Sequence, residues 1–235
     1  MNIFYAPNAA LNQHVVLDEQ ESFHITRVLR KKVSEELYVF DGKGNLFDGR
    51  ISAIGKKEVT VHLVRWMEKL ESDRPKLHIA IAPPKNIDRF EWFLEKATEI
   101  GVDEITPLLC KHSERKDLRT DRLEKVLVAA CKQSLKYQLP KLNEMQSFDT
   151  FVSSINGTSR KYLAYCDEKT MHLKDAYHGG FDAVLLIGPE GDFTREEVLL
   201  AGKHEFETVS LGKSRLRLET AGVYAAAAFN LINDK

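Results

Sequence analysis

The sequence predicts an α/β protein with a small N-terminal β-barrel and a larger C-terminal domain in which helices flank a parallel sheet. Three observations lead to this prediction. Short segments with alternating apolar residues follow one another before residue 70. After Lys76, a strand, a helix and a second strand follow within about 30 residues, which is typical of a parallel βαβ unit. A charged stretch ending at Pro75 separates the two patterns.

The N-terminal part, residues 1–70, is expected to be a small antiparallel sheet or barrel. Residues 19–30 are expected to form a short helix before its main strands. The turn 42–45, with two glycines, is expected to join the first two of these strands as a hairpin. The strand segments read ELYVFDG, NLFDGRISAI and KEVTVHLV.

The C-terminal part, residues 76–235, is expected to begin with the buried strand KLHIAIAPPK. Asp88 is expected to cap the next helix and Gly101 to end it, and the strand EITPLL follows. Asp121 is expected to open a further helix with Glu124 as its capping-box partner. The remaining strands are expected in KYLAYC, AVLLIG and ETVSLG, and helices are expected to start at Thr194 and near Glu219.

Composition excludes several classes of protein. With 43% hydrophobic and 29% charged residues, the chain resembles a soluble globular protein, and no apolar run approaches the roughly 20 residues of a membrane span. The N-terminus lacks a basic segment followed by an apolar core, so we expect no secretory signal and a cytoplasmic protein. The three cysteines form no CxxC pair, and the histidines lack metal-ligand spacing. We therefore expect no disulfide framework and no metal.

Three predicted strands end in unusual loops, PPK after Ile81, GPEG after Ile187 and GKSR after Leu211. Because open α/β sheets bind ligands at the carboxyl ends of their strands, these loops are expected to be neighbours. Glycines in them either bring main-chain groups close to a nucleoside-like ligand or simply form tight turns, and the sequence leaves both open. The patterns GxxxxGK[ST] and GxGxxG are absent, so a ligand with adenosine and amino-acid character fits better than ATP or NAD.

Charge is concentrated in two places. The loops and their surroundings carry Lys85, Lys213, Arg215 and Arg217 with two acids, Glu190 and Glu219. Residues 111–141 hold nine basic against four acidic residues, although the whole chain has a net charge of only −1. This segment is either a solvated helix face or a surface that contacts nucleic-acid phosphates.

Two C-terminal motifs, LLIGPEGDFTREEV and LGKSRLRLETA, resemble those of the RsmE family of the SPOUT superfamily, which are S-adenosylmethionine-dependent enzymes that methylate N3 of a uridine in 16S ribosomal RNA. HITRVLR, VFDGKGNLFDGRI, EKATEIGVDEITPLLC and KQSLKYQLP extend the resemblance over nearly the whole chain. It implies a PUA-like N-terminal barrel, a C-terminal SPOUT domain with a deep trefoil knot, and a homodimer that acts on 16S rRNA or the small ribosomal subunit.

The resemblance also implies roles for particular residues. Arg217 is expected to be catalytic by stabilising the uracil anion, although a salt bridge to Glu219 or to phosphate is the alternative. No residue stands out as a general base. The donor S-adenosylmethionine is expected to contact Pro84, Leu186, Ile187, Gly188, Pro189, Glu190, Gly191, Leu211, Gly212 and Leu216. RNA is expected to contact Arg27, Arg30, Lys31, Lys85, Gln133, Lys136 and Arg215.

The chain departs from the family pattern at three of its residues. Gln133 matches a family motif, but Lys132 and Lys136 stand where an acid and an arginine are usual, and Ser214 stands where arginine is common. The roles of these three residues are open at this point. Two other functions also remain open: a SPOUT methyltransferase for another RNA position, and a non-catalytic RNA-binding module, which would have no reason to bind the donor.

Overall fold

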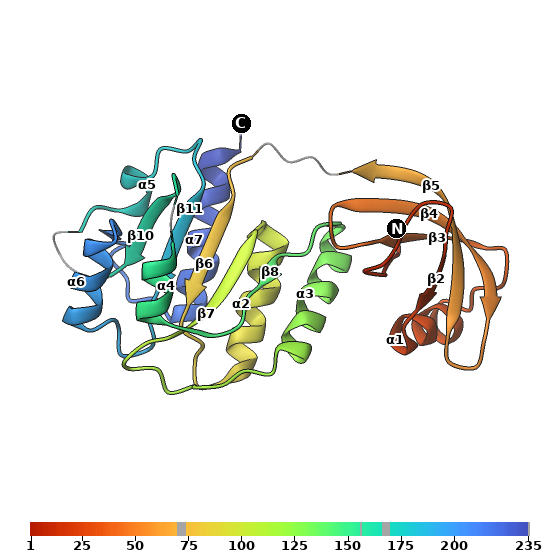
Figure 1. Ribbon diagram of the computed structural model, residues 1–235, viewed down its shortest axis with the longest axis horizontal. Coiled ribbons are helices and arrows are strands. Elements are labelled where there is room, and N and C mark those ends of the chain that lie inside the picture. The colour runs from red at the N-terminus through yellow and green to blue at the C-terminus, as the bar shows by residue number, and fades with distance from the viewer. Residues whose placement is uncertain (70–73, 156, 166–169, 235) are drawn as a thin grey trace. The chain divides into compact units, whose positions relative to one another are not determined.

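A computed structural model of the chain describes residues 1–69, 74–155, 157–165 and 170–234 (Figure 1). The chain forms two compact units. The first consists of Met1–Ser72 together with Val128–Leu139, and the second of Asp73–Leu127 together with Pro140–Lys235. The segment 128–139 therefore belongs to the N-terminal unit although it is far along the chain.

The first unit is built on a curled five-stranded sheet in the order β1-β3-β4-β5-β2. The strand β1 pairs in parallel with β3, and the other pairs are antiparallel. Register shifts between β4 and β5 mark the irregularities at which such a sheet bends. The strands are β1 (Ile3–Tyr5), β2 (His14–Leu17), β3 (Glu36–Phe40), β4 (Asn45–Ile54) and β5 (Val59–Lys69).

The turn between β3 and β4 contains Gly42 and Gly44 at φ 77° and 95°, a conformation that favours glycine. This confirms the predicted hairpin. The predicted helix over 19–30 is two short pieces, α1 (Glu19–Phe23) and the π-helix η1 (His24–Val28), and it ends before Arg30, whose φ is 55°. Asp18 caps α1 by accepting a hydrogen bond from the Glu21 amide at 2.7 Å.

The second half of helix α3 (Thr120–Ser134) completes the core of the first unit. Cys131 is buried there together with Ile3, Phe40 and Leu46. Lys132 places its Nζ 2.7 Å from Glu21 Oε2, whose side chain is only 7% exposed. The lysine that departs from the family pattern thus has a structural role, because it neutralises a buried carboxylate within the unit.

The second unit contains a parallel sheet in the order β12-β10-β11-β6-β7-β8, with β9 paired to β7. All five residues of β11 are buried, as expected for a parallel strand covered on both faces. This confirms the predicted parallel α/β domain. The strands are β6 (Leu77–Ile81), β7 (Glu104–Leu109), β8 (Lys141–Leu142), β9 (Gln146–Ser147), β10 (Arg160–Ala164), β11 (Ala183–Ile187) and β12 (Glu207–Val209).

Helices lie along this sheet in two groups (Figure 1). Helices α4 and α6 contact each other, and α2 and α7 contact each other. Ala80 and Ala82 of the β6 region pack in the cluster that contains α4 and α6, whereas Ile81 between them faces Gly222 of α7. The helices are α2 (Ile87–Ile100), α4 (Phe148–Ser154), α5 (Leu173–Ala176), α6 (Arg195–Lys203) and α7 (Leu218–Asn233).

The helix ends agree with the sequence in two cases and differ in two. Gly101 ends α2 at φ 127°, and Thr194 and Glu197 form the predicted capping box of α6. Asp88 does not cap α2, because the Asn86 side chain does so by accepting from the Asp88 amide at 3.0 Å. Asp121 lies inside the first turn of α3, which begins at Thr120.

Two of the cysteines are buried and unpaired. Burial raises the pKa of the Cys131 thiol to about 12 and also raises the pKa of Cys110. Both are core residues, as expected, and Cys166 lies outside the described residues. Among the helices of the described chain, none has the length and apolar character that a bilayer crossing requires.

Candidate functional site

A cavity of about 740 Å³ opens at the carboxyl ends of β10 and β11 in the second unit. Two loops form most of its wall, the one after β11 and the one between β12 and α7. This is the edge at which parallel sheets bind ligands. The lining consists of Arg89, Ala164, Tyr165, Ile187, Gly188, Pro189, Glu190, Asp192, Leu211, Gly212, Lys213, Ser214, Arg215, Leu216, Arg217, Leu218, Glu219 and Ala221.

Seven of the ten residues predicted to contact the donor line this cavity: Ile187, Gly188, Pro189, Glu190, Leu211, Gly212 and Leu216. The other three lie elsewhere. Leu186 is fully buried in the core, and Gly191 packs on His112. The carbonyl of Pro84 accepts a hydrogen bond from Arg115 Nε at 3.1 Å.

Backbone hydrogen bonds hold the loop after β12 in place. The Ser210 amide donates to the Met171 carbonyl at 2.8 Å, and the Leu173 amide donates to the Ser210 carbonyl at 2.9 Å. The Gly212 amide donates to Ser210 Oγ at 3.1 Å. The cavity wall that contains Gly212 is therefore fixed to the segment after β10.

The loop positions 188, 191 and 212 are occupied by glycine for different structural reasons. A Cβ on Gly188 would lie 3.1 Å from the ring of Phe193, and a Cβ on Gly191 would lie 3.1 Å from His112 Cβ. These two positions are small because protein atoms fill the space. Gly212 has φ 130° and only His172 Nε2, at 4.0 Å, near its hypothetical Cβ. Gly212 therefore leaves open the space that a ligand would use.

The PPK loop after β6 supports the cavity wall but does not line the cavity. The Lys85 amide donates to Glu190 Oε1 at 3.3 Å, which joins the PPK loop to the GPEG loop. Arg115, in the segment after β7, donates to the Pro84 and Lys85 carbonyls at 3.1 and 2.6 Å. His112 Nδ1 lies 3.1 Å from the Gly191 and Asp192 carbonyls. Neighbouring loops thus brace the cavity wall without lining it.

Charged side chains surround the cavity, and one of them is buried. Lys213, Arg215 and Arg217 are exposed, whereas Glu219 in the first turn of α7 is 6% exposed. Its ion-pair partner is Arg89 of α2, whose Nε lies 3.8 Å from Glu219 Oε1. The sequence-based alternative of an Arg217–Glu219 salt bridge is not among the described contacts.

Arg89 and Asp192 line the cavity, but the sequence did not predict them as site residues. Arg89 lies three residues after the helix cap Asn86, a spacing that carries no chemical signature. Asp192 has φ 62°, and its side chain accepts a hydrogen bond from the Phe193 amide at 2.8 Å. Burial raises the pKa of the Asp192 carboxyl, while the Phe193 amide and Arg215 act against this.

The residues predicted to contact RNA belong to both units. Arg215 lines the cavity, and Lys85 pairs with Glu114 at 2.9 Å. Arg27, Arg30 and Gln133 are exposed, and they belong to the first unit. That unit also contains two partly buried members of the set, Lys31, whose Nζ donates to the Glu36 carbonyl at 2.7 Å, and Lys136.

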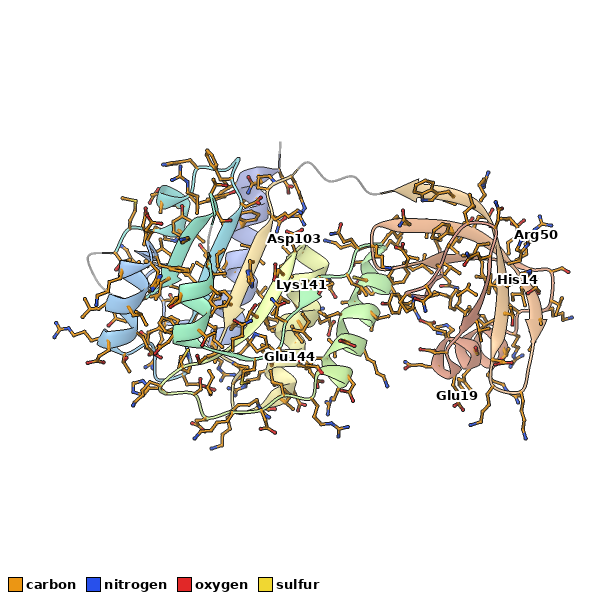
Figure 2. All side chains as sticks on the ribbon, viewed as in Figure 1. His14, Glu19, Arg50, Asp103, Lys141 and Glu144 are labelled. Carbon is orange, nitrogen blue, oxygen red and sulfur yellow. The ribbon has the colours of Figure 1, made fainter. Side chains whose placement is uncertain are left out.

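Some basic residues of the segment 111–141 form ion pairs and others do not. Arg122 pairs with Glu91, Lys132 with Glu21 and Lys141 with Glu104. Within the described residues, Lys116, Arg119 and Lys125 are exposed and form no ion pair. Lys141 and Asp103 lie near the amino-terminal end of β7, away from the cavity loops (Figure 2). At that end Asp103 binds Arg74 at 2.8 Å.

Comparison with known proteins agrees with this geometry. The RNA methyltransferase domain family matches residues 71–230, and the RNA methyltransferase PUA domain family matches residues 17–64. A ribosomal RNA small subunit methyltransferase E from Rickettsia conorii is 28% identical over 98% of this chain and 95% of that protein.

Solved structures are similar over almost the full length. A probable rRNA-methyltransferase from Porphyromonas gingivalis has 38% identity and a TM-score of 0.92, covering 99% of this chain and 98% of that one. A ribosomal RNA small subunit methyltransferase E from Neisseria gonorrhoeae, bound to S-adenosyl methionine, has 28% identity and a TM-score of 0.85 over 99% and 98%. The chain, with its PUA-like curled sheet and its parallel α/β domain, therefore belongs to the RsmE family of RNA methyltransferases.

Proposed function

We propose that the protein transfers a methyl group from S-adenosylmethionine to N3 of a specific uridine in 16S ribosomal RNA of the small ribosomal subunit. The observation that carries the proposal is the cavity between the GPEG loop and the GKSR loop, into which the family's two C-terminal motifs converge. Family membership supports the reaction type, and the donor-bound relative from Neisseria gonorrhoeae supports the cofactor.

The residues of the cavity fit this donor. Its volume lies within the range of roughly 300 to 1,000 Å³ that is usual for small-ligand sites. Ile187, Pro189, Leu211 and Leu216 give it apolar walls for an adenine ring, and Gly212 leaves space beside the main chain. When bound, the donor supplies a methyl group already activated by its sulfonium.

Arg217 is the residue we propose for catalysis. Uracil must lose the proton on N3 before that nitrogen can attack, and negative charge then spreads over N3, O2 and O4. Arg217 is exposed at the cavity, just before α7, and its side chain makes no capping hydrogen bond to the helix. Its guanidinium is therefore available to stabilise the anion. Because N3 lies on the Watson–Crick edge, the target uridine must be unpaired or extruded.

RNA binding is proposed to use both domains, with residues 1–70 as the PUA-like part and 76–235 as the methyltransferase part. Arg27, Arg30 and Lys31 would bind phosphates from the first, and Lys85 and Arg215 from the second. Gln133 and Lys136, assigned from the family motif, now belong to the first unit. The free cations Lys116, Arg119 and Lys125 add to this positive surface.

A homodimer is also proposed, and an apolar stripe on α7 supports it. Tyr224 and Leu231 are 40% and 77% exposed, and they lie on the same helix face as Thr220 and Ala227. A monomer would leave this stripe in water. Light scattering at micromolar concentration that gave the mass of one chain would contradict the dimer.

The trefoil knot is kept as an expectation from the family. Backbone hydrogen bonds at the end of β12 support it. The Tyr165 amide donates to the Val209 carbonyl, and the Ser210 amide donates to the Met171 carbonyl. Val209 is thus bonded to the chain before the segment 166–169, and Ser210 to the chain after it, as expected for a threaded strand.

The reaction is tested with purified protein, radiolabelled donor and either free 16S rRNA or small subunits from a strain that lacks the gene. We expect one methyl group per RNA, at the N3 position of one uridine, located by reverse-transcription arrest and by mass spectrometry of the nucleoside. Methylation of a different atom or a different RNA would favour a SPOUT enzyme for another position. Donor binding without any transfer would contradict the proposed reaction, and no donor binding would favour the RNA-binding module.

A further inference from the structure

The ion pair between Arg89 and Glu219 lies at one end of the contact between α2 and α7. Gly222 allows this contact, because a Cβ there would overlap the ring of Phe93. Arg89 lies four residues before Phe93 on α2, and Glu219 lies three residues before Gly222 on α7, so each shares a helix face with the packed residue. The close approach of the two helices therefore brings the guanidinium and the carboxylate together.

Both charged groups face the cavity with unused hydrogen-bonding capacity. They line the cavity, and their shortest N–O distance is 3.8 Å, which is too long for a hydrogen bond. Among the described residues, no hydrogen bond reaches the side chain of either Arg89 or Glu219. Their side chains are 42% and 8% exposed, so Glu219 in particular has little contact with solvent.

Glu219 differs from the other charges of the cavity in burial. Glu190, Lys213, Arg215 and Arg217 are exposed, and the cations among them suit RNA phosphates at the mouth. Asp192 already accepts a hydrogen bond from the Phe193 amide. Glu219 is therefore the buried charged side chain of the cavity, and the amino-terminal position on α7 helps to stabilise its carboxylate.

We infer that Arg89 and Glu219 recognise the amino-acid end of the methyl donor, with Arg89 binding its carboxylate and Glu219 its ammonium group. This inference rests on the proposed function, because it assumes that the cavity holds S-adenosylmethionine. A zwitterion carries opposite charges on adjacent groups, and the two side chains offer the complementary charges side by side. Two charge-assisted hydrogen bonds would then fill the capacity that the ion pair leaves unused. The two residues would decide which sulfonium compounds the cavity accepts.

Three ligands test this inference by calorimetry: S-adenosylmethionine, its decarboxylated form, and an analogue that lacks the amino group. We expect wild-type protein to bind each truncated ligand about tenfold or more weakly than the intact donor, since each leaves one charged partner without a hydrogen bond. Equal affinity for the three ligands would overturn the inference while leaving the proposed function intact. A wild-type protein that binds none of them would contradict the proposed function itself.

Variants then assign each contact. Arg89→Met should bind the intact donor more weakly than wild type does. Its affinities for the intact donor and for the decarboxylated form should be equal, and it should still bind the analogue without an amino group more weakly than the intact donor. Glu219→Gln should bind the intact donor and the analogue without an amino group with equal affinity. It should still bind the decarboxylated form more weakly than the intact donor. Arg160→Met and Glu207→Gln are matched controls on β10 and β12 outside the cavity, and both should keep the wild-type pattern. If Arg89→Met weakened all three ligands by the same factor, its role would be structural and the assignment would be wrong.

Discussion

The two sheets of this protein leave their functional groups in different places. In the curled sheet of the first unit, side chains alternate between core and solvent, as in β2, where Val15 and Leu17 are buried and His14 and Val16 are exposed. In the parallel sheet, β11 is buried throughout, so that only the loops at its strand ends reach a ligand. The first unit therefore exposes side chains along its strands, whereas the second has a cavity at its strand ends.

Gly212→Leu tests the cavity and should have the largest effect. The new side chain would project into the open space beside Gly212, and we expect donor binding to be abolished while the chain stays folded. Calorimetry with S-adenosylmethionine measures the affinity, and circular dichroism checks the fold.

Gly180→Leu is the matched control for this change. Gly180 also has a positive φ, 79°, with open space around it, but it does not line the cavity. A leucine there also has a positive φ but does not block a ligand. Unchanged donor affinity in Gly212→Leu would place the donor site elsewhere.

Arg217→Ala separates chemistry from binding at the mouth of the cavity. At saturating donor and RNA, we expect the methyl-transfer rate to fall about 10²-fold or more, as for loss of one preorganised electrostatic group. Donor affinity should change little, and higher pH should restore part of the rate because it makes the uracil anion more available. Normal turnover with weakened RNA affinity would mean that Arg217 only binds phosphate.

His78 provides a test that concerns the parallel sheet alone. Its ring is partly buried, its Nε2 lies 2.8 Å from Thr106 Oγ1, and desolvation lowers its pKa from 6.5 to about 4. The unfolded chain binds this proton at higher pH than the folded one. The contribution of His78 to the free energy of unfolding is therefore fully present above pH 6.5. About 2 to 3 kcal/mol of it is lost as the pH falls from 6.5 towards 4.

We expect His78→Gln to remove this part of the pH dependence. Urea unfolding at pH 7 and pH 4.5 measures it as the difference between wild type and variant. The exposed His178→Gln is the control and should follow the wild type. If His78→Gln lost as much stability as the wild type between the two pH values, other groups would account for the acid sensitivity.

Charge reversal on the first unit should have the smallest effect. Arg30→Glu with Lys31→Glu should weaken RNA binding by roughly tenfold at moderate salt and reduce the slope of log affinity against log salt by about two, without changing donor affinity. Arg50→Glu with Lys57→Glu reverses two other cations of the same unit, of which Arg50 is labelled in Figure 2. Equal loss in both double variants would indicate attraction by net charge, not a defined contact.

Local patterns predicted much of the fold. The hairpin, the βαβ pattern of β6, α2 and β7, the helix end at Gly101 and the capping box at Thr194 all depend on residues close together in the sequence. The sequence did not show that 128–139 joins the first unit, because the apolar stripe of α3 continues past the point where its packing partners change. Nor could it show that Lys132 meets Glu21, since 111 residues separate them.

Most of the wall of the candidate site could also be predicted from local sequence patterns. Motifs located most of the cavity wall, because each loop carries its own glycine pattern next to a strand. Arg89 was missed, since its partner Glu219 is distant in sequence and nothing near Arg89 marks it. The sequence left two explanations open for the loop glycines, ligand access and tight turns. It could not show that a side chain at Gly188 or Gly191 would meet Phe193 or His112.

The contact between Gly222 and Phe93 has a consequence for how this protein can vary. Because Ile81 also lies against Gly222, the space is closed on two sides, and any larger residue must displace one of these neighbours. A second-site suppressor of Gly222→Ala should therefore appear at Phe93 as a smaller apolar residue such as leucine. Positions 93 and 222 should change together or not at all, and a genetic selection for restored methylation would reveal this as a linked pair.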